Sequence, residues 1–159
     1  MAVNPELLEA LTTGIQSEVA AYVFYIEAIK LTEANGIKGT LENLAAEEKK
    51  HFQILERQYD SLVRSEKWIS TADVLKQEGL PEIDARMAEK HVDLIENVRN
   101  LKSPHEILNM ALKLEIEAQE LFVKLAATSK SDEGKKVFTH LAGFEEGHAK
   151  LIQGHIDNL

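Results

Sequence analysis

Residues 44–55 read LAAEEKKHFQIL, and they have a counterpart in residues 141–152, which read LAGFEEGHAKLI. The two stretches are 97 residues apart, and the same offset aligns each half of the chain with the other without a gap. Glu48 falls on Glu145 and His51 falls on His148, so each stretch contains the pattern Glu-x-x-His. An offset that places acids on acids and apolar residues on apolar residues indicates two copies of one structural unit.

Each unit contains a further glutamate 30 residues before its Glu-x-x-His. Glu18 precedes Glu48 by this distance, and Glu115 precedes Glu145 by the same distance. The midpoints fall at about residues 33 and 130, within or beside predicted helix breaks. An antiparallel helical hairpin that turns there brings its two glutamates to the same height, roughly 22 Å from the turn at 1.5 Å per residue.

The register of these residues predicts that they point inward. Glu18 lies seven residues after Leu11 and seven before Tyr25, so it shares one helix face with both apolar side chains, and Glu115 is placed in the same way in the second unit. Each histidine follows its glutamate by three residues and therefore lies beside it on the same face. We expect six polar side chains in the core, namely Glu18, Glu48, His51, Glu115, Glu145 and His148.

The predicted fold class is all-α, because no alternating pattern of β-branched residues bounded by turns occurs in the chain. With 159 residues, the chain is long enough for one domain with a real core, residues 1–159. Helical hairpins are expected over residues 1–60 and 103–157. If the second hairpin repeats the first about a two-fold axis, the connection, residues 61–102, must travel the length of the molecule. The sequence therefore predicts a ferritin-like four-helix bundle with a long crossover between its second and third helices.

Local signals predict the helix boundaries. Asparagine or serine followed by proline predicts helix starts at residues 4–5 and 103–104. Asn35, Gly36 and Gly39 predict a break, after which a second helix starts near Thr40 and continues toward Trp68. Within the connection, we expect one short helix over residues 71–78, closed by a glycine, and another over residues 82–100.

Composition and charge exclude several function classes. The 18 basic and 27 acidic residues give a formal net charge of −9, which is the wrong sign for binding nucleic acid or anionic lipid. Absence of cysteine excludes disulfides and thiolate metal sites. The N-terminal stretch lacks a basic run before an apolar core, and no long apolar segment follows, so we expect a cytoplasmic protein without membrane association.

Four glutamates in one core would be strongly destabilising without compensation, because a buried unpaired charge costs several kcal/mol, as an order of magnitude. Two divalent cations would balance the four carboxylates, and two neutral imidazoles would complete the ligand shells. One glutamate from each of two helices plus Glu-x-x-His from each of the other two is the ligand set of di-iron and di-manganese carboxylate bundles. A metal-free scaffold bundle is the alternative.

On these residues the chain resembles the ferritin-like superfamily, specifically rubrerythrin-like proteins, over residues 1–60 and 103–157. The resemblance implies a carboxylate-bridged pair of iron ions, with Fe/Fe expected and Mn/Fe left open. It implies that Glu48 and Glu145 bridge the ions and that Glu18 and Glu115 bind one ion each. It further implies a non-haem di-iron oxidoreductase that reduces hydrogen peroxide or dioxygen in oxidative-stress defence.

The sequence departs from the rubrerythrin pattern in two ways. The 159 residues contain none of the cysteines that a rubredoxin domain uses to bind iron, so we expect electrons to come from ferrous iron or from a separate donor protein such as a rubredoxin. Ala118 stands where rubrerythrins carry an additional glutamate. The resulting six-residue set is similar to that of bacterioferritin, so a ferroxidase or iron-storage protein is the alternative function. In either case we expect a homodimer or a larger homo-oligomer.

Tyr25 is the candidate catalytic residue, since it lies on the ligand face seven residues after Glu18. It would donate a hydrogen bond to a ligand or hold a radical, and a purely structural tyrosine is the alternative. The remaining histidines have no partner in the repeat and are expected to be structural or at the surface: His91, His105, His140 and His155.

The register generates a first prediction. Glu48→Ala and Glu145→Ala should each remove more bound metal than Glu117→Ala, because Glu117 is turned away from the ligand face, two residues from Glu115. Metal content per chain, measured on the purified variants, checks this. Equal losses in all three variants would contradict the register.

Overall fold

The computed structural model describes residues 4–32 and 36–159, and within these ranges every regular element is a helix. The order is α1 (Pro5–Leu31), α2 (Gly36–Ser65), α3 (Thr71–Leu75), α4 (Ala85–Glu89), α5 (Val92–Arg99), α6 (Pro104–Thr128) and α7 (Asp132–Asp157). The predicted all-α class is confirmed. None of the described helices contains an apolar stretch long enough to cross a membrane.

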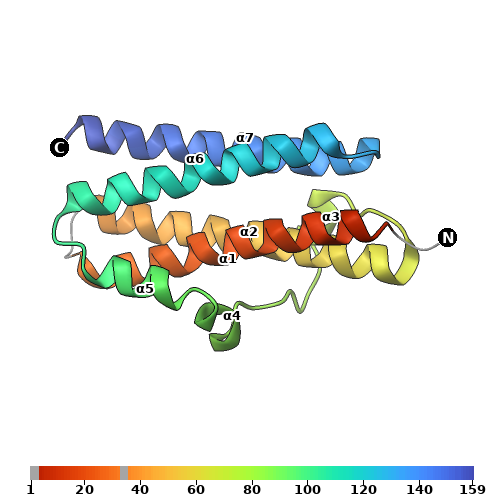
Figure 1. Ribbon diagram of the computed structural model, residues 1–159, viewed down its shortest axis with the longest axis horizontal. Coiled ribbons are helices and arrows are strands. Elements are labelled where there is room, and N and C mark those ends of the chain that lie inside the picture. The colour runs from red at the N-terminus through yellow and green to blue at the C-terminus, as the bar shows by residue number, and fades with distance from the viewer. Residues whose placement is uncertain (1–3, 33–35) are drawn as a thin grey trace.

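Four long helices, α1, α2, α6 and α7, run along the long axis of the molecule as two antiparallel hairpins, α1 with α2 and α6 with α7 (Figure 1). The chain leaves α2 at one end and enters α6 at the opposite end, so α3, α4 and α5 lie on a connection that travels the length of the long helices (Figure 1). This connection packs on the first hairpin, mainly against α1. The middle of one hairpin therefore lies opposite the middle of the other.

Two of the long helices, α1 and α6, start where the capping signals predict. The Asn4 side chain accepts a hydrogen bond from the Glu6 N–H at 2.9 Å, and Pro5 occupies the first turn. Ser103 accepts from the Glu106 N–H at 3.2 Å before Pro104. These caps satisfy backbone donors that the first helical turn leaves without partners.

The boundaries of α2 differ from the prediction at both ends. It begins at Gly36 and not near Thr40, so Gly39 lies inside the helix, whereas Asn35 falls outside the described residues. It ends at Ser65, short of Trp68 and beyond the predicted boundary at residue 60. Glu66 adopts a left-handed conformation with φ of 58°, and its N–H donates a hydrogen bond to the Leu62 carbonyl. This conformation ends the helix.

The connection is less helical than predicted. The helix expected over residues 71–78 ends at Leu75, and the chain turns at Gly79, whose φ is 66°. The single helix expected over residues 82–100 is two short helices, α4 and α5. Asp84 caps the first of them through the Met87 N–H, and the backbone of His91, with φ of −116° and ψ of 30°, interrupts the helix before α5.

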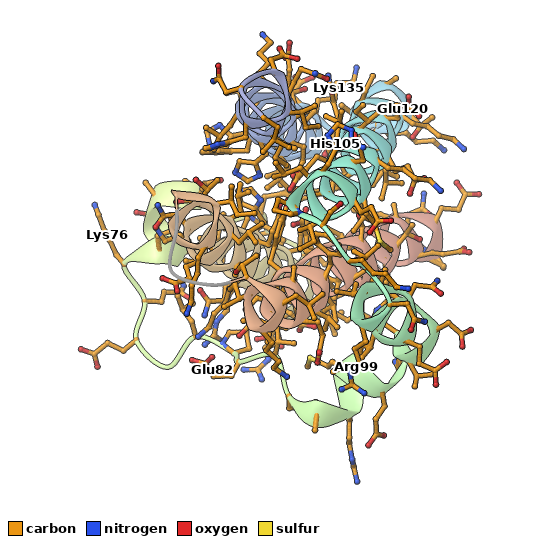
Figure 2. All side chains as sticks on the ribbon, turned by 90° about the vertical axis from the view of Figure 1, so that its left-hand side faces the viewer. Lys76, Glu82, Arg99, His105, Glu120 and Lys135 are labelled. Atoms are coloured by element: carbon orange, nitrogen blue, oxygen red, sulfur yellow. The ribbon has the colours of Figure 1, made fainter. Side chains whose placement is uncertain are left out.

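Apolar side chains fill the space between the long helices, and charged side chains such as Lys76, Glu82, Glu120 and Lys135 lie on the outside (Figure 2). The connection contributes to the core through Val98, which is fully buried, and through the partly buried residues Ile83, Met87, Leu94 and Ile95. Trp68 packs edge-on against Phe138 of α7, with ring centroids 6.3 Å apart. It thereby joins the start of the connection to the second hairpin.

The close contact at Trp68 generates a prediction about stability. A Cβ atom on Gly134, in the first turn of α7, would lie 2.5 Å from the Ser129 hydroxyl and 2.9 Å from the Trp68 ring. We therefore expect Gly134→Ala to lower the free energy of unfolding by about 1–3 kcal/mol. Gly143→Ala is the control in the same helix, because nothing lies within 4 Å of its Cβ position, and it should stabilise by up to about 1 kcal/mol. Thermal or urea unfolding that moved both variants in the same direction would contradict the packing at Trp68.

Candidate metal centre

All six predicted side chains meet at mid-height between the two hairpins. Glu18 comes from α1, Glu48 and His51 from α2, Glu115 from α6, and Glu145 and His148 from α7. Their exposed fractions lie between 0 and 8%, with His148 the most exposed. The heptad register predicts this arrangement correctly: Leu11, Glu18 and Tyr25 are all buried on one face of α1.

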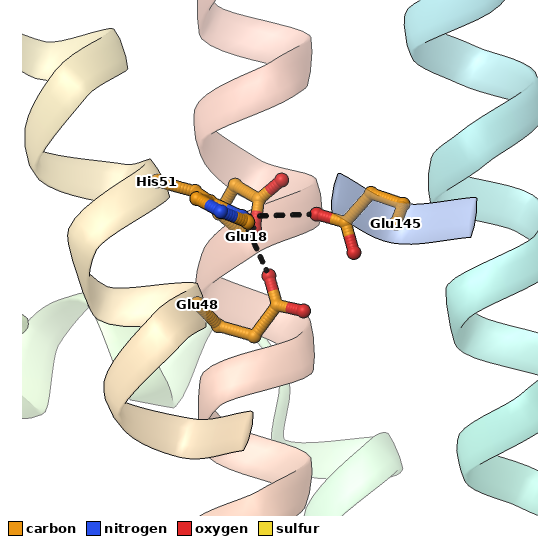
Figure 3. Close-up of side chains that lie close together, drawn as sticks. All are labelled: Glu18, Glu48, His51 and Glu145. Atoms are coloured by element: carbon orange, nitrogen blue, oxygen red, sulfur yellow. Dashed lines mark hydrogen bonds and ion pairs between the residues drawn. The ribbon is translucent and has the colours of Figure 1, made fainter. Parts of the chain in front are cut away.

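The first group, which we call the first position, consists of Glu18, Glu48, His51 and Glu145 (Figure 3). Potential ligand atoms of these residues all lie within 4.8 Å of one another. His51 Nδ1 lies 3.2 Å from Glu145 Oε1, 3.5 Å from Glu48 Oε2 and 3.6 Å from Glu18 Oε2. One imidazole nitrogen thus faces three carboxylates that come from three different helices.

The second group, which we call the second position, consists of Glu48, Glu115, Glu145 and His148. His148 Nδ1 lies 3.1 Å from Glu48 Oε1, 3.3 Å from Glu145 Oε2 and 3.4 Å from Glu115 Oε2. The two histidine rings are stacked, with their centroids 5.7 Å apart and an interplanar angle of 14°.

Glu48 and Glu145 belong to both positions, and each uses its two oxygens for different neighbours. Glu48 turns Oε2 toward His51 and Oε1 toward His148. Glu145 turns Oε1 toward His51 and Oε2 toward His148. Two carboxylates that each face both positions have the arrangement that bridging ligands of a metal pair require.

Tyr25 lies against the second position. Its hydroxyl donates a hydrogen bond of 2.5 Å to Glu115 Oε1, and its side chain is fully buried. Burial first, and then the Glu115 charge, raises the pKa of Tyr25 well above its usual value, which keeps the hydroxyl protonated. The structure therefore supports the prediction that Tyr25 hydrogen-bonds a candidate ligand.

The chemistry of this cluster fits divalent metal ions. Several of its buried atoms have no hydrogen-bond partner: both oxygens of Glu18, Oε2 of Glu48, Oε2 of Glu115, Oε2 of Glu145 and Nε2 of His51. A buried polar atom without a partner is costly, so such a concentration is expected where a bound group completes the site. Carboxylate and imidazole donors without thiolate suit iron, manganese or zinc. The buried glutamates and histidines can thus hold metal ions.

Protonation balances the cluster when no metal is bound. Burial raises the pKa of Glu18 well above its usual value, and the neighbouring carboxylates add to this effect. Burial, followed by contact with Glu145, raises the pKa of Glu115 to about 7. Burial also opposes ionisation of Glu48 and Glu145, but hydrogen bonds with their neighbours, including both histidines, lower the pKa of each.

The two histidines are held in their charged forms in the absence of metal. Burial disfavours each imidazolium, but hydrogen bonds to the carboxylates outweigh burial. The pKa of His51 is raised to about 9 and that of His148 to about 12. Two anionic glutamates and two cationic histidines then neutralise each other, and a metal pair would replace the protons.

Four other glutamates that are near the ligands in sequence, and the four remaining histidines, belong to neither group. Glu117, Glu120 and Glu146 are exposed, and Glu47 is partly exposed. His105 and His140 are exposed, whereas His91 and His155 are partly buried. His155 lies near the end of α7, where Nε2 is 3.1 Å from the Thr40 hydroxyl of α2.

Phe144 is a neighbour of the site that the heptad pattern does not predict. Its ring is 39% exposed, and its centroid lies 5.0 Å from that of His51. The residue directly precedes Glu145, so helical geometry turns it about 100° away from the ligand face. Only the packing of α7 beside α2 brings it over His51, and no signal within one helix could have indicated this.

Comparison with known proteins supports the fold. No family model and no curated protein matches the chain. Among solved structures, the chain is similar to a hypothetical protein from Pyrococcus furiosus, with a TM-score of 0.66 and 25% sequence identity over 95% of this chain and 88% of that one. A protein described as hypothetical brings no activity with it, so the likeness concerns the architecture.

The pKa shifts generate a prediction about pH. In the metal-free protein, Glu18, Glu115 and His51 all have raised pKa values. At a pH above the usual pKa of 4.5 for glutamate or 6.5 for histidine, the folded state therefore binds more protons than the unfolded state. The stability that they contribute is present at low pH and is lost as the pH rises toward about 9. We expect the melting temperature of chelator-treated protein to fall as the pH rises from about 6 to about 9. These limits correspond to the usual and the raised pKa of His51.

Metal binding should show the opposite dependence on pH. Ions displace protons from the same groups, so the increase in melting temperature on adding a divalent ion should grow as the pH rises. Melting curves with and without the ion at several pH values measure both effects. A metal-free melting temperature that rose over this range would contradict the assigned shifts.

Proposed function

We propose that the chain is a ferritin-like four-helix bundle that holds two iron ions and reduces hydrogen peroxide or dioxygen, as rubrerythrin-like proteins do. Its electrons would come from ferrous iron or from a separate redox protein. The observation that carries the proposal is the placement of Glu48 and Glu145, each of which turns one oxygen toward His51 and the other toward His148. A pair of ferrous ions would supply two electrons together, as cleavage of a peroxide O–O bond requires.

The protein side chains contribute to this chemistry in three ways. First, the carboxylates of Glu18 and Glu115 offer one terminal ligand to each position, which balances the charge of the pair. Second, burial of all six side chains excludes bulk water and every large substrate, which favours small oxidants. Third, Tyr25 holds a proton at its hydroxyl beside Glu115 and remains a hydrogen-bond donor at neutral pH.

The proposal can be tested with protein loaded anaerobically with two ferrous ions per chain. We expect hydrogen peroxide to oxidise this protein faster than an equal concentration of dioxygen. Faster oxidation by dioxygen, with continued uptake of ferrous iron well beyond the two sites, would instead support a ferroxidase or storage protein. Assembly size, measured by light scattering, provides an independent readout, since storage requires a cage of many subunits.

A histidine substitution tests the role of the pair. His148→Ala removes the only nitrogen ligand of the second position and should leave some iron bound at the first. A single ferrous ion gives one electron to peroxide and releases hydroxyl radical, so we expect slower peroxide consumption and more radical per iron, measured by spin trapping. His105→Ala, which changes an exposed histidine at the start of α6, is the control. If His148→Ala matched the parent protein in both rate and radical yield, the paired-metal mechanism would be wrong.

A further inference from the structure

The 97-residue repeat makes the two metal positions nearly equivalent, so departures from the repeat show where they differ. Glu18 corresponds to Glu115 and His51 to His148, and Glu48 and Glu145 exchange roles. Equivalent ligands alone would give two positions with equal affinity. Two departures from the repeat lie in contact with the ligands, at Tyr25 beside Glu115 and at Phe144 beside His51.

The first departure concerns the number of free oxygens. Tyr25 corresponds to Phe122, which has no hydroxyl. Tyr25 therefore donates a hydrogen bond to Glu115 Oε1 at 2.5 Å and leaves Oε2 as the oxygen without a hydrogen-bond partner, whereas neither oxygen of Glu18 has one. Each position has four ligand residues, but the terminal glutamate of the first position has two oxygens without a hydrogen-bond partner and that of the second position has one.

The second departure concerns what covers each histidine. Phe144 lies over His51, with ring centroids 5.0 Å apart, and His51 is only 2% exposed. The residue that corresponds to Phe144 is Glu47, which is partly exposed and pairs with Lys50 at 3.7 Å. His148, the counterpart of His51, is 8% exposed. An apolar ring therefore closes the first position, and the second has only a charged residue at the corresponding place.

We propose that the two positions are inequivalent: the first binds its ion earlier and more tightly, and the second keeps a coordination place for a small oxygen- or nitrogen-donor ligand. A terminal glutamate that binds through both oxygens would leave less of the coordination shell open than one that binds through a single oxygen. The hydrogen bond from Tyr25 thereby sets the second position apart, because it withholds one oxygen of Glu115. The inference rests on the two-ion centre of the proposed function and is independent of the redox reaction.

Titration of metal-free protein with Co²⁺, followed by visible absorption and calorimetry, tests the proposal. We expect two ions per chain in two resolved steps. His51→Ala should abolish the tighter step, and His148→Ala should abolish the weaker one. Failure to bind Co²⁺ at all would overturn the metal centre itself, whereas two indistinguishable steps would overturn only the inequivalence.

Tyr25→Phe tests the proposed cause. The substitution frees Glu115 Oε1, so the affinity of the second step should rise about tenfold, the equivalent of one hydrogen bond to a charged acceptor. Tyr22→Phe, which removes a hydroxyl from a partly buried tyrosine of the same helix, should change neither step. A lower affinity of the second step in Tyr25→Phe would mean that the tyrosine only positions Glu115, and would overturn the proposal.

Azide added to the Co²⁺-loaded protein probes the open coordination place. We expect one azide per metal pair, seen as a change in the cobalt spectrum, and weaker azide binding in Tyr25→Phe because the freed oxygen competes for the place. General damage to the site would weaken the binding of both Co²⁺ ions and of azide. The proposal instead predicts tighter binding of the second Co²⁺ ion and weaker binding of azide. Azide affinity that is unchanged in Tyr25→Phe would overturn the assignment of the open place.

Phe144→Ala tests the closure of the first position. Loss of the ring should accelerate removal of the first ion by a chelator and leave the rate for the second ion unchanged. Leu151→Ala, on the same helix and 47% exposed, is the matched control and should affect neither rate. If Phe144→Ala accelerated both rates equally or neither of them, the ring would not be the cover of the first position.

Discussion

Four carboxylates buried at one level between four helices form the constraint on which the rest of the structure depends. They cannot all be charged without compensation, because charges removed from water at this separation repel one another strongly. The protein has two ways to neutralise them, with protons on Glu18, Glu115 and the histidines, or with two divalent cations. Helix lengths, hairpin turns and the long connection all serve to hold these groups at the same height.

Much of this arrangement could be predicted from the sequence, because it depends on periodicity within long helices. Seven-residue spacing places Glu18 on the buried face of α1 whatever the neighbours are, and the repeat extends the same argument to Glu115. The connection lacks such periodicity. Its course depends on tertiary contacts, such as the Gln58 side chain that donates to the carbonyl of Ile69 and accepts from its N–H. The position of Phe144 over His51 has the same origin, since it depends on packing between α7 and α2.

One source of the asymmetry of the molecule is the connection, which packs mainly on the first hairpin and contacts the second at Trp68. Val19 is 1% exposed on α1, whereas the corresponding Ile116 on α6 is 40% exposed. Ile54 is 2% exposed on α2, and the corresponding Leu151 on α7 is 47% exposed. The two hairpins thus share an inner face that carries the ligands and differ in their outer faces. Chemistry near the centre can diverge between the halves without loss of the shared frame.

Each hairpin carries half of the ligand set, one glutamate on its first helix and Glu-x-x-His on its second. Two identical hairpins related by a two-fold axis would therefore already build the whole centre, and the present chain has the form expected from duplication and fusion of such an ancestor. Covalent linkage makes the pairing of the halves independent of concentration. It also lets each copy mutate separately, so that a hydroxyl or an aromatic ring can be placed beside one of the two positions and not the other, a specialisation closed to a symmetric homodimer.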